Sequence, residues 1–181
     1  MIATIFDTET TALIDNHVIA IDRQPHVIEF YGCHVDLRTG QIHRELEHLI
    51  RPPNPKSIDE EVAKKSHNIT WDLVKDKPRF SDLADEIIAF LEARGMVVAH
   101  NLAFDKEMMD VEAERLGRKI DWPMRQCCTV EQTTWLKGSW LSLSDLHEYL
   151  FAMKFDGAHR AKNDTMALVK CCVELHSRGW V

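Results

Sequence analysis

Three short clusters in the sequence place carboxylates beside apolar residues, in positions where metal-dependent chemistry would be feasible. The first cluster spans residues 5–11 and contains Asp7 and Glu9. The second spans residues 100–105 and ends in an aspartate, and the third spans residues 159–164 and does the same. An ionised carboxylate in an apolar setting is unfavourable unless a cation pairs with it. The pattern therefore predicts bound cations.

The first two acids lie at the end of a buried strand expected at residues 2–9. Side chains alternate along a strand, so Asp7 and Glu9 point to the same face as the apolar Ile5. They also lie at the carboxyl end of that strand, where open α/β sheets tend to bind ligands. We therefore expect the two carboxylates to face a ligand together.

Two helices each carry an aspartate close to their first turn. One is expected to run to about Leu116 and the other from about Asn163 to Ser177. The apolar stripe of the first helix contains Leu102, Asp105, Met109 and Leu116. The stripe of the second contains Asp164, Leu168, Cys171 and Leu175. Both aspartates should therefore point inward.

The rest of the pattern predicts an α/β fold with a mixed central sheet and helices on both faces. Hairpin strands come first and helix-strand-helix units follow. The expected hairpin strands are 26–36 and 41–51, after a loop at 11–25. The later elements are short helical turns within 56–80, a helix from Ser81 to Arg94, a strand at 96–99, and helices at 127–136 and 142–149. No domain boundary is evident, so residues 1–181 are expected to form a single domain.

Composition narrows the class of protein. A chain of 181 residues that is 45% hydrophobic can bury a core. Its net charge of −7 argues against a broad grip on duplex nucleic acid, although a local cation site could still attract phosphate. The five cysteines show no CxxC spacing, and no secretory leader or membrane span is recognisable. We expect a cytoplasmic protein with reduced thiols and no membrane contact.

Hard divalent cations such as Mg²⁺ or Mn²⁺ prefer oxygen ligands and would suit four inward carboxylates. Each residue also has a simpler explanation. An aspartate at a strand end is often only a turn former, Asp105 and Asp164 could favour a helix dipole, and His159 alone would usually be a surface residue. The occurrence of the four carboxylates and the histidine in one pattern favours the metal site.

The three clusters closely resemble the motifs of the DEDDh branch of the 3′→5′ exonucleases, which includes the DnaQ-like proofreading subunits, RNase T and the oligoribonucleases. The first family motif is Asp-x-Glu, here Asp7 to Glu9. The second is Asn-x-x-x-Asp, here Asn101 to Asp105, and the third is His-x-x-x-x-Asp, here His159 to Asp164. A softer match is the stretch 66–70. The resemblance covers residues 2–175, and the three motifs occur in the family's order.

The sequence departs from the family pattern near the expected substrate groove. Ala12 and Asn68 stand where many members have glycine, and the loop from Ala12 to Pro25 looks longer than usual. Because they lie beside the groove, these departures would affect the path of the bound strand. The motif carboxylates show no departure.

The resemblance implies an RNase H-like fold that binds two Mg²⁺ or Mn²⁺ ions. Asp7 would contact both ions, Glu9 and Asp164 would hold the ion that activates water, and Asp105 would support the second ion. Two such ions can stabilise the attacking and the leaving oxygen of an in-line displacement. His159 would take the proton from the attacking water.

The resemblance also implies contacts with the terminal nucleotide. Residues expected to contact substrate are Thr8, Thr10, Leu13, His67, Asn101 and Phe104. Leu13 and Phe104 could stack on bases, but core packing is an equal alternative for Phe104. His67 could instead cap a turn. Arg160 and Lys162 could meet backbone phosphate, although solvated charges are the usual case.

The function expected is a metal-dependent 3′→5′ exonuclease that releases nucleoside 5′-monophosphates from single-stranded DNA or RNA with a free 3′ end. A non-catalytic nucleic-acid-binding module is an alternative, which the complete set of carboxylates disfavours. A proofreading subunit of a polymerase assembly is another. Because the sequence ends at Val181, soon after the last motif, a polymerase partner is not indicated. A homodimer is left open, since several members of the family are dimers.

Overall fold

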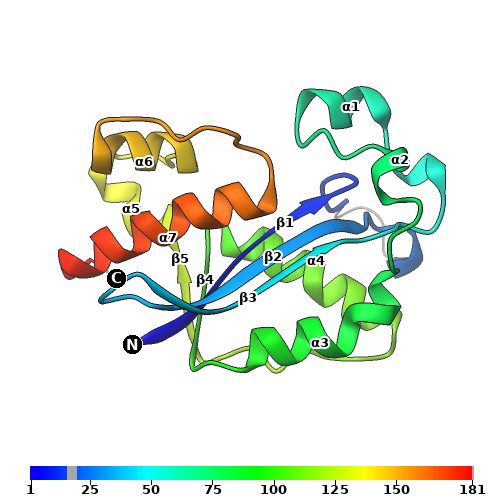
Figure 1. The fold of residues 1–181 in the computed structure, drawn as a ribbon, viewed down its shortest axis with the longest axis horizontal. Helices are drawn as coiled ribbons and strands as arrows, with labels where there is room; N and C mark the ends of the chain where they lie inside the picture. The colour runs from blue at the N-terminus through cyan, green and yellow to red at the C-terminus, as the bar shows by residue number, and fades with distance from the viewer. Residues whose placement is uncertain (16–19, 181) are drawn as a thin grey trace.

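A mixed sheet of five strands lies at the centre of the protein. The computed structural model describes residues 1–15 and 20–180. The strands are β1 (Ile2–Thr10), β2 (Val27–Asp36), β3 (Gln41–Leu49), β4 (Met96–Ala99) and β5 (Arg125–Cys128). Their spatial order is β3-β2-β1-β4-β5. β2 is antiparallel to β1 and β3, whereas β4 is parallel to β1 and β5, which confirms the mixed sheet (Figure 1).

Helices cover both faces of this sheet. On one face lie α3 (Phe80–Glu92) and α4 (Leu102–Arg115). On the other lies α7 (Ala161–Ser177), with α6 (Leu143–Phe151) packed against it. The shorter elements are α1 (Glu60–Lys65), α2 (Trp71–Val74), α5 (Thr129–Thr133) and 3-10 turns at Ile21–Arg23, Pro55–Ser57 and Thr134–Leu136. Figure 1 shows α1 and α2 near the end of β1.

The alternation of β1 divides the core into two layers. Ala3 and Ile5 are fully buried in the layer that includes Leu168 of α7. Phe6 points the other way, into the layer formed with α3 and α4. The same period of two carries forward to the end of the strand. It therefore directs the residues after Phe6 alternately toward α7 and toward α4.

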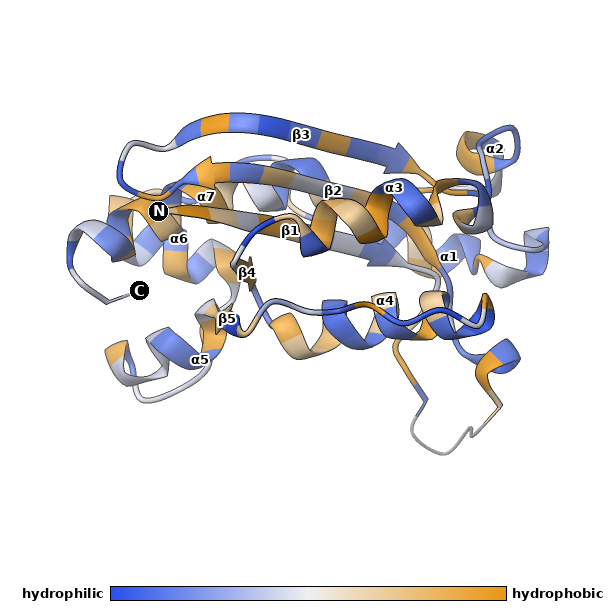
Figure 2. Cartoon of the chain, turned by 90° about the horizontal axis from the view of Figure 1, so that it is seen from below, coloured by the Kyte–Doolittle hydropathy of each residue, from blue (hydrophilic) through white to orange (hydrophobic). Residues whose placement is uncertain are grey.

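The edge strand β3 contributes little to this core. It is largely hydrophilic, in contrast to the apolar stretches of β1 and β2 (Figure 2). Arg44, Glu45 and Glu47 of β3 are exposed, and Leu46 is the buried residue of the strand. Charged side chains on an edge strand disfavour pairing with another sheet. The buried functional geometry must therefore come from the inner strands.

The helix expected at residues 127–136 is wrong in its first part. Arg125–Cys128 forms β5, and Cys127 and Cys128 lie opposite Val98 and Ala99 of β4. Only Thr129–Thr133 and the following turn are helical. A short apolar segment has no period long enough to separate helix from strand. Pairing with β4 decides the outcome here.

Two details at helix ends also differ from expectation. Ser81 does not cap α3; the helix begins one residue earlier, and the Arg79 amide donates to the Asp82 carboxylate at 2.9 Å. Leu116, expected on the buried stripe of α4, is 39% exposed because the helix ends at Arg115. The other expected elements are confirmed, with small shifts at their ends.

The loop expected at residues 11–25 contains the 3-10 turn Ile21–Arg23, and its residues 16–19 lie outside the described part of the chain. Within the described ranges 1–15 and 20–180, no helix has the length and apolar character that crossing a bilayer requires.

Candidate active site

Three carboxylates from two elements meet on the α7 face of the sheet. Asp7 and Glu9 come from β1, where the alternation points both toward α7. Asp164 comes from the first turn of α7. One oxygen of each carboxylate lies within 4.8 Å of the others, and all three residues are half-buried. These residues form what we call the acid cluster.

Burial, together with repulsion from neighbouring carboxylates, disfavours the charged form of every member of the acid cluster. Burial is the main cause that raises the pKa of Asp7, and the charges of Asp105 and Glu9 add to it. Burial, followed by the charge of Asp164, raises the pKa of Glu9 to about 8. Burial also raises the pKa of Asp164. Near neutral pH the cluster therefore favours either protons or cations.

Asp105 reaches this site from the opposite face of the sheet. It lies in the first turn of α4 and is 2% exposed. Its Oδ1 accepts hydrogen bonds from the Thr8 amide at 3.0 Å and from the Thr8 hydroxyl at 2.7 Å. Burial raises the pKa of Asp105, while the two bonds from Thr8 lower it. Asp105 therefore lies beside the acid cluster, close enough to influence Asp7, but outside the group of three.

The third motif folds back on its own aspartate. His159 has a φ of +67°, in the left-handed region, and its amide donates to Asp164 Oδ2 at 2.9 Å. The His159 side chain is exposed. The backbone of the histidine is thus tied to the acid cluster while its imidazole faces solvent. This placement suits a group that must meet water and substrate.

Two of the expected substrate-binding residues lie at the end of β1, whose last residue is Thr10, and in the segment just after it. The Thr10 hydroxyl donates to the Ala12 carbonyl oxygen at 2.8 Å. Leu13 is 77% exposed, so its side chain is free to meet a ligand. The Thr8 amide and hydroxyl are both engaged with Asp105, which leaves its carbonyl oxygen rather than these groups for other contacts.

Three further expected contacts come from other segments. His67 is 6% exposed, and its Nδ1 accepts from the Ile69 amide at 3.0 Å. Burial lowers the pKa of His67, and the nearby charge of Glu29 opposes this effect. Phe104 is half-buried and packs against the α3–α4 core layer, whereas Asn101 is exposed and adopts a left-handed φ of +72°. His67 thus lies near the charges of Glu29 and Arg160, and its Nδ1 is used to hold the local turn.

The unusual Asn68 has a conformational reason. Its φ is +57°, in the left-handed region that glycine adopts freely. Asparagine tolerates this region better than most residues with a side chain. The departure from glycine therefore preserves the local turn.

Sequence reasoning missed a fifth carboxylate, Glu29 of β2, which is 1% exposed. It forms an ion pair with Arg160, so the guanidinium of Arg160 is held by the protein although the side chain stays 39% exposed. Lys162 is also paired, with Glu47, and lies over the Tyr31 ring. The available signal was an acidic residue within the apolar run of residues 27–31.

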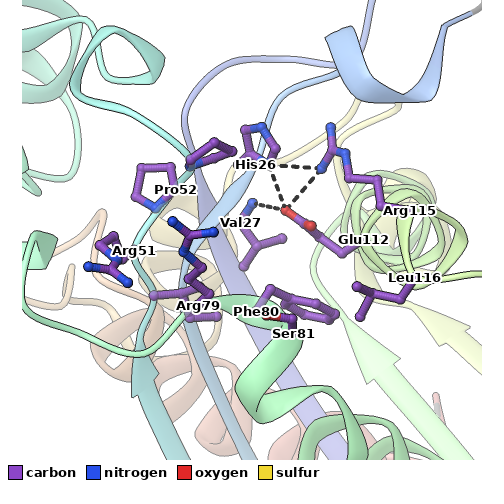
Figure 3. A pocket seen from close by; sticks show the side chains of 12 residues that line it. His26, Val27, Arg51, Pro52, Arg79, Phe80, Ser81, Glu112, Arg115 and Leu116 are labelled. Atoms are coloured by element: carbon purple, nitrogen blue, oxygen red, sulfur yellow. Dashed lines mark hydrogen bonds and ion pairs between the residues drawn. The ribbon is translucent and has the colours of Figure 1, made fainter.

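A second missed cluster anchors the loop that follows β1. Glu112 of α4 accepts from the Val27 amide at 3.0 Å and pairs with Arg115 and His26 (Figure 3). Arg115 also donates to the carbonyl oxygens of Ile21, Gln24 and Pro25. A cavity of about 130 Å³ on the α4 face is bordered by Glu112, Arg115, His26 and Val27. The cluster ties the end of the loop to α4, close to the start of β2.

Solved structures share this fold. "Exonuclease X in complex with 5' overhanging duplex DNA" is 24% identical, with a TM-score of 0.67 over 99% of this chain and 94% of that one. The nuclease domain of 3'hExo, described as a DEDDh family member bound to rAMP, is 14% identical, with a TM-score of 0.78 over 98% of this chain and 92% of that one. The fold is therefore RNase H-like, as expected.

The relatives found by sequence similarity carry the names of DNA polymerase III epsilon subunits and of an exodeoxyribonuclease. DNA polymerase III subunit epsilon of Treponema pallidum is 29% identical over 179 residues, which cover 95% of this chain and 73% of the relative. The epsilon subunit of Pasteurella multocida is 28% identical over 117 residues, which cover 65% and 44%. Exodeoxyribonuclease 10 of Escherichia coli is 32% identical over 125 residues, which cover 66% and 48%. The chain thus spans less than half the length of the last two relatives.

The fold and the family match together define an exonuclease of the RNase H-like class. The family model RNase_T, described as an exonuclease, matches residues 4–172. The chain therefore belongs to the RNase T family of exonucleases, which confirms the DEDDh, DnaQ-like resemblance found in the motifs.

Glu9→Gln tests whether the acid cluster disfavours the ionised form of Glu9. The pKa of Glu9 is about 8 in the fold, against 4.5 for the free side chain, so the folded protein without metal retains a proton that the unfolded chain releases. The stability linked to this proton is fully present below pH 4.5 and is lost as the pH rises to about 8. Glutamine does not titrate. The melting temperature of Glu9→Gln minus that of the wild type, measured in chelator, should therefore rise across this range.

The exposed Glu107→Gln is the matched control, and its difference from the wild type should stay level with pH. If the melting-temperature difference between Glu9→Gln and the wild type also stayed constant with pH, the raised pKa of Glu9 would be refuted.

Proposed function

We propose that this protein is a metal-dependent 3′→5′ exonuclease that acts on single-stranded DNA or RNA and releases nucleoside 5′-monophosphates. The observation that carries the proposal is the acid cluster of Asp7, Glu9 and Asp164, whose oxygens lie within 4.8 Å of one another. Membership in an exonuclease family gives that cluster its chemical context. Residues 1–181 would act as a single exonuclease domain.

The side chains of the site fit hard divalent cations. The donor set consists of carboxylate oxygens only. The pKa values of Asp7, Glu9 and Asp164 are raised, so a bound cation would stabilise their ionised forms. We assign Asp7, Glu9, Asp164 and Asp105 as the ligands of two Mg²⁺ or Mn²⁺ ions. Bound there, the ions would supply an activated water and stabilise charge on the attacking and leaving oxygens.

His159 is assigned as the general base. It accepts a proton from the attacking water, whose oxygen forms a bond to the phosphorus of the last linkage. The bond from that phosphorus to the 3′ oxygen of the preceding nucleotide breaks, and this oxygen takes a proton from solvent. The products are a 5′-monophosphate and a strand with a new 3′ hydroxyl. The exposure of His159, together with the bond from its backbone amide to Asp164, supports this assignment.

The terminal nucleotide would be held at the carboxyl end of β1. We assign the Thr8 backbone, Thr10 and His67 to its sugar and phosphate. Leu13, which is exposed, and Phe104 would pack against bases. Asn101 would contact the strand from the start of α4.

A proofreading role beside a polymerase is the second candidate. It is favoured by relatives named DNA polymerase III subunit epsilon. The chemistry at the acid cluster would be the same, and only the partner would differ.

A homodimer remains a prediction. The five cysteines are all buried and free, which agrees with the proposed cytoplasmic location.

Asp7→Asn should abolish hydrolysis, because it removes the central carboxylate of the acid cluster. Removing a carboxylate whose charged form is already disfavoured should leave the metal-free fold intact. Release of nucleotide from an end-labelled oligonucleotide in Mg²⁺ measures the loss, and circular dichroism checks the fold. Asp121→Asn, the same change at an exposed position, should retain wild-type activity. Normal turnover by Asp7→Asn would refute the metal assignment.

Direction is tested with the 3′ end of the substrate. A single-stranded oligonucleotide that carries a 3′-phosphate should resist degradation, whereas the same strand with a 5′-phosphate should be shortened from its 3′ end. DNA, RNA and dinucleotide substrates, run with Mg²⁺ and with chelator, then define the preferred polymer. Cleavage that proceeds despite the 3′-phosphate would indicate an endonuclease.

A further inference from the structure

Glu29 lies beside the acid cluster without belonging to it. It is on β2, directly opposite Glu9 of β1, and is 1% exposed. Residues directly opposite each other in an antiparallel pair point to the same face, and like charges in that arrangement repel. A buried carboxylate at this position needs a cation close by. The structure supplies that cation from the segment that carries the third motif.

The contacts of Glu29 use both of its oxygens. Arg160 Nε donates to Oε1 and Oε2 at 3.1 Å each, and Arg160 Nη2 donates to Oε1 at 2.5 Å. The Ala161 amide donates to Oε2 at 2.9 Å. A forked arginine contact of this kind combines charge with strict geometry. Because both oxygens are occupied, Glu29 is poorly placed to serve as a further metal ligand.

These contacts grip the backbone on both sides of Arg160. The His159 amide is bound to Asp164, and the Ala161 amide is bound to Glu29. Between them, the Arg160 side chain reaches back to Glu29. Residue 159 also has a left-handed φ of +67°, which needs support from its surroundings. The segment 159–161 is therefore tied to β2 and to the acid cluster, while the imidazole of His159 stays exposed.

We propose that Glu29 is a positioning residue: by holding Arg160 and the Ala161 amide, it fixes the backbone from which His159 reaches the acid cluster. This inference rests on the proposed function, because His159 needs a fixed position only if it acts in hydrolysis. The ion pair has a second consequence. Arg160 compensates the charge of Glu29, and its charge also lowers the pKa of Glu9.

Glu29→Gln is the direct test. Glutamine keeps the shape and one acceptor but loses the charge and half of the fork. The remaining Arg160 side chain is 39% exposed, so water can solvate it. The kcat on a single-stranded oligonucleotide should fall at least about tenfold, and by no more than the ~10²–10⁴ that a positioned general base contributes. The KM should stay within about twofold, because ground-state binding of the strand is unchanged.

The matched control removes a neighbouring ion pair from the same helix turn. Lys162 pairs with Glu47 at 2.6 Å, and both side chains are about half exposed. Glu47→Gln should leave kcat within about twofold, since an exposed ion pair contributes little. Arg160→Lys, which keeps the charge but not the fork, is the second variant and should also lower kcat. An unchanged kcat in Glu29→Gln and Arg160→Lys would overturn the positioning role.

A double-mutant cycle with His159→Ala shows through which residue Glu29 acts. In the His159→Ala background, Glu29→Gln should lower the residual kcat by less than about twofold, because the group it positions is gone. A full additional loss in that background would overturn the proposal and indicate that Glu29 acts on the cations or the strand.

Amide hydrogen exchange provides a readout that needs no activity. In metal-free Glu29→Gln, the amides of His159 and Ala161 should exchange faster than in the wild type, while β1 amides keep their protection. Unchanged exchange at both amides would overturn the proposal that Glu29 fixes this backbone. Faster exchange with a wild type that hydrolyses no substrate would instead overturn the proposed function, so the two failures are distinguishable.

Discussion

Repulsion among carboxylates at the end of β1 is the constraint on which the site depends. The pleat of the strand directs Asp7 and Glu9 to one face, and Asp164 meets them from α7. Burial raises the pKa of each residue, and the charges of neighbouring carboxylates add to this effect. Such a cluster is stable when it holds protons or cations, and only the second state leaves the carboxylates ionised. The fold therefore creates a site at the carboxyl end of β1 that favours the binding of positive charge.

The surrounding residues limit this repulsion without removing it. Thr8 donates two hydrogen bonds to Asp105, which keeps this aspartate on the α4 side of the strand. Arg160 neutralises Glu29, the carboxylate that faces Glu9 across the β1–β2 pair. Arg160 thus offsets part of the charge of Glu29, which still raises the pKa of Glu9. Asp7, Glu9 and Asp164 keep raised pKa values, as does Asp105, so all four carboxylates would gain from a bound cation.

The sequence predicted those parts of the site that depend on local periods. A period of two placed Asp7 and Glu9 on one face, and a helical stripe turned Asp164 inward. The fold class followed from the order of strands and helices. Contacts between distant segments were not readable, because no local pattern links Glu29 to Arg160, which is 131 residues further along the chain. The same limit applies to β5, which β4 converts into a strand, and to Leu116, which lies just past the end of α4.

The most direct test of this account is calorimetric titration of the chelator-treated protein with Mn²⁺ at pH 7, in two buffers of different ionisation enthalpy. Because the pKa of Glu9 is about 8 and that of Asp7 is raised, ion binding must displace protons from the acid cluster. We expect two bound ions and release of about one proton or more per protein. Mn²⁺ binding without proton release, or no binding at all, would contradict the claim that this cluster is built for cations.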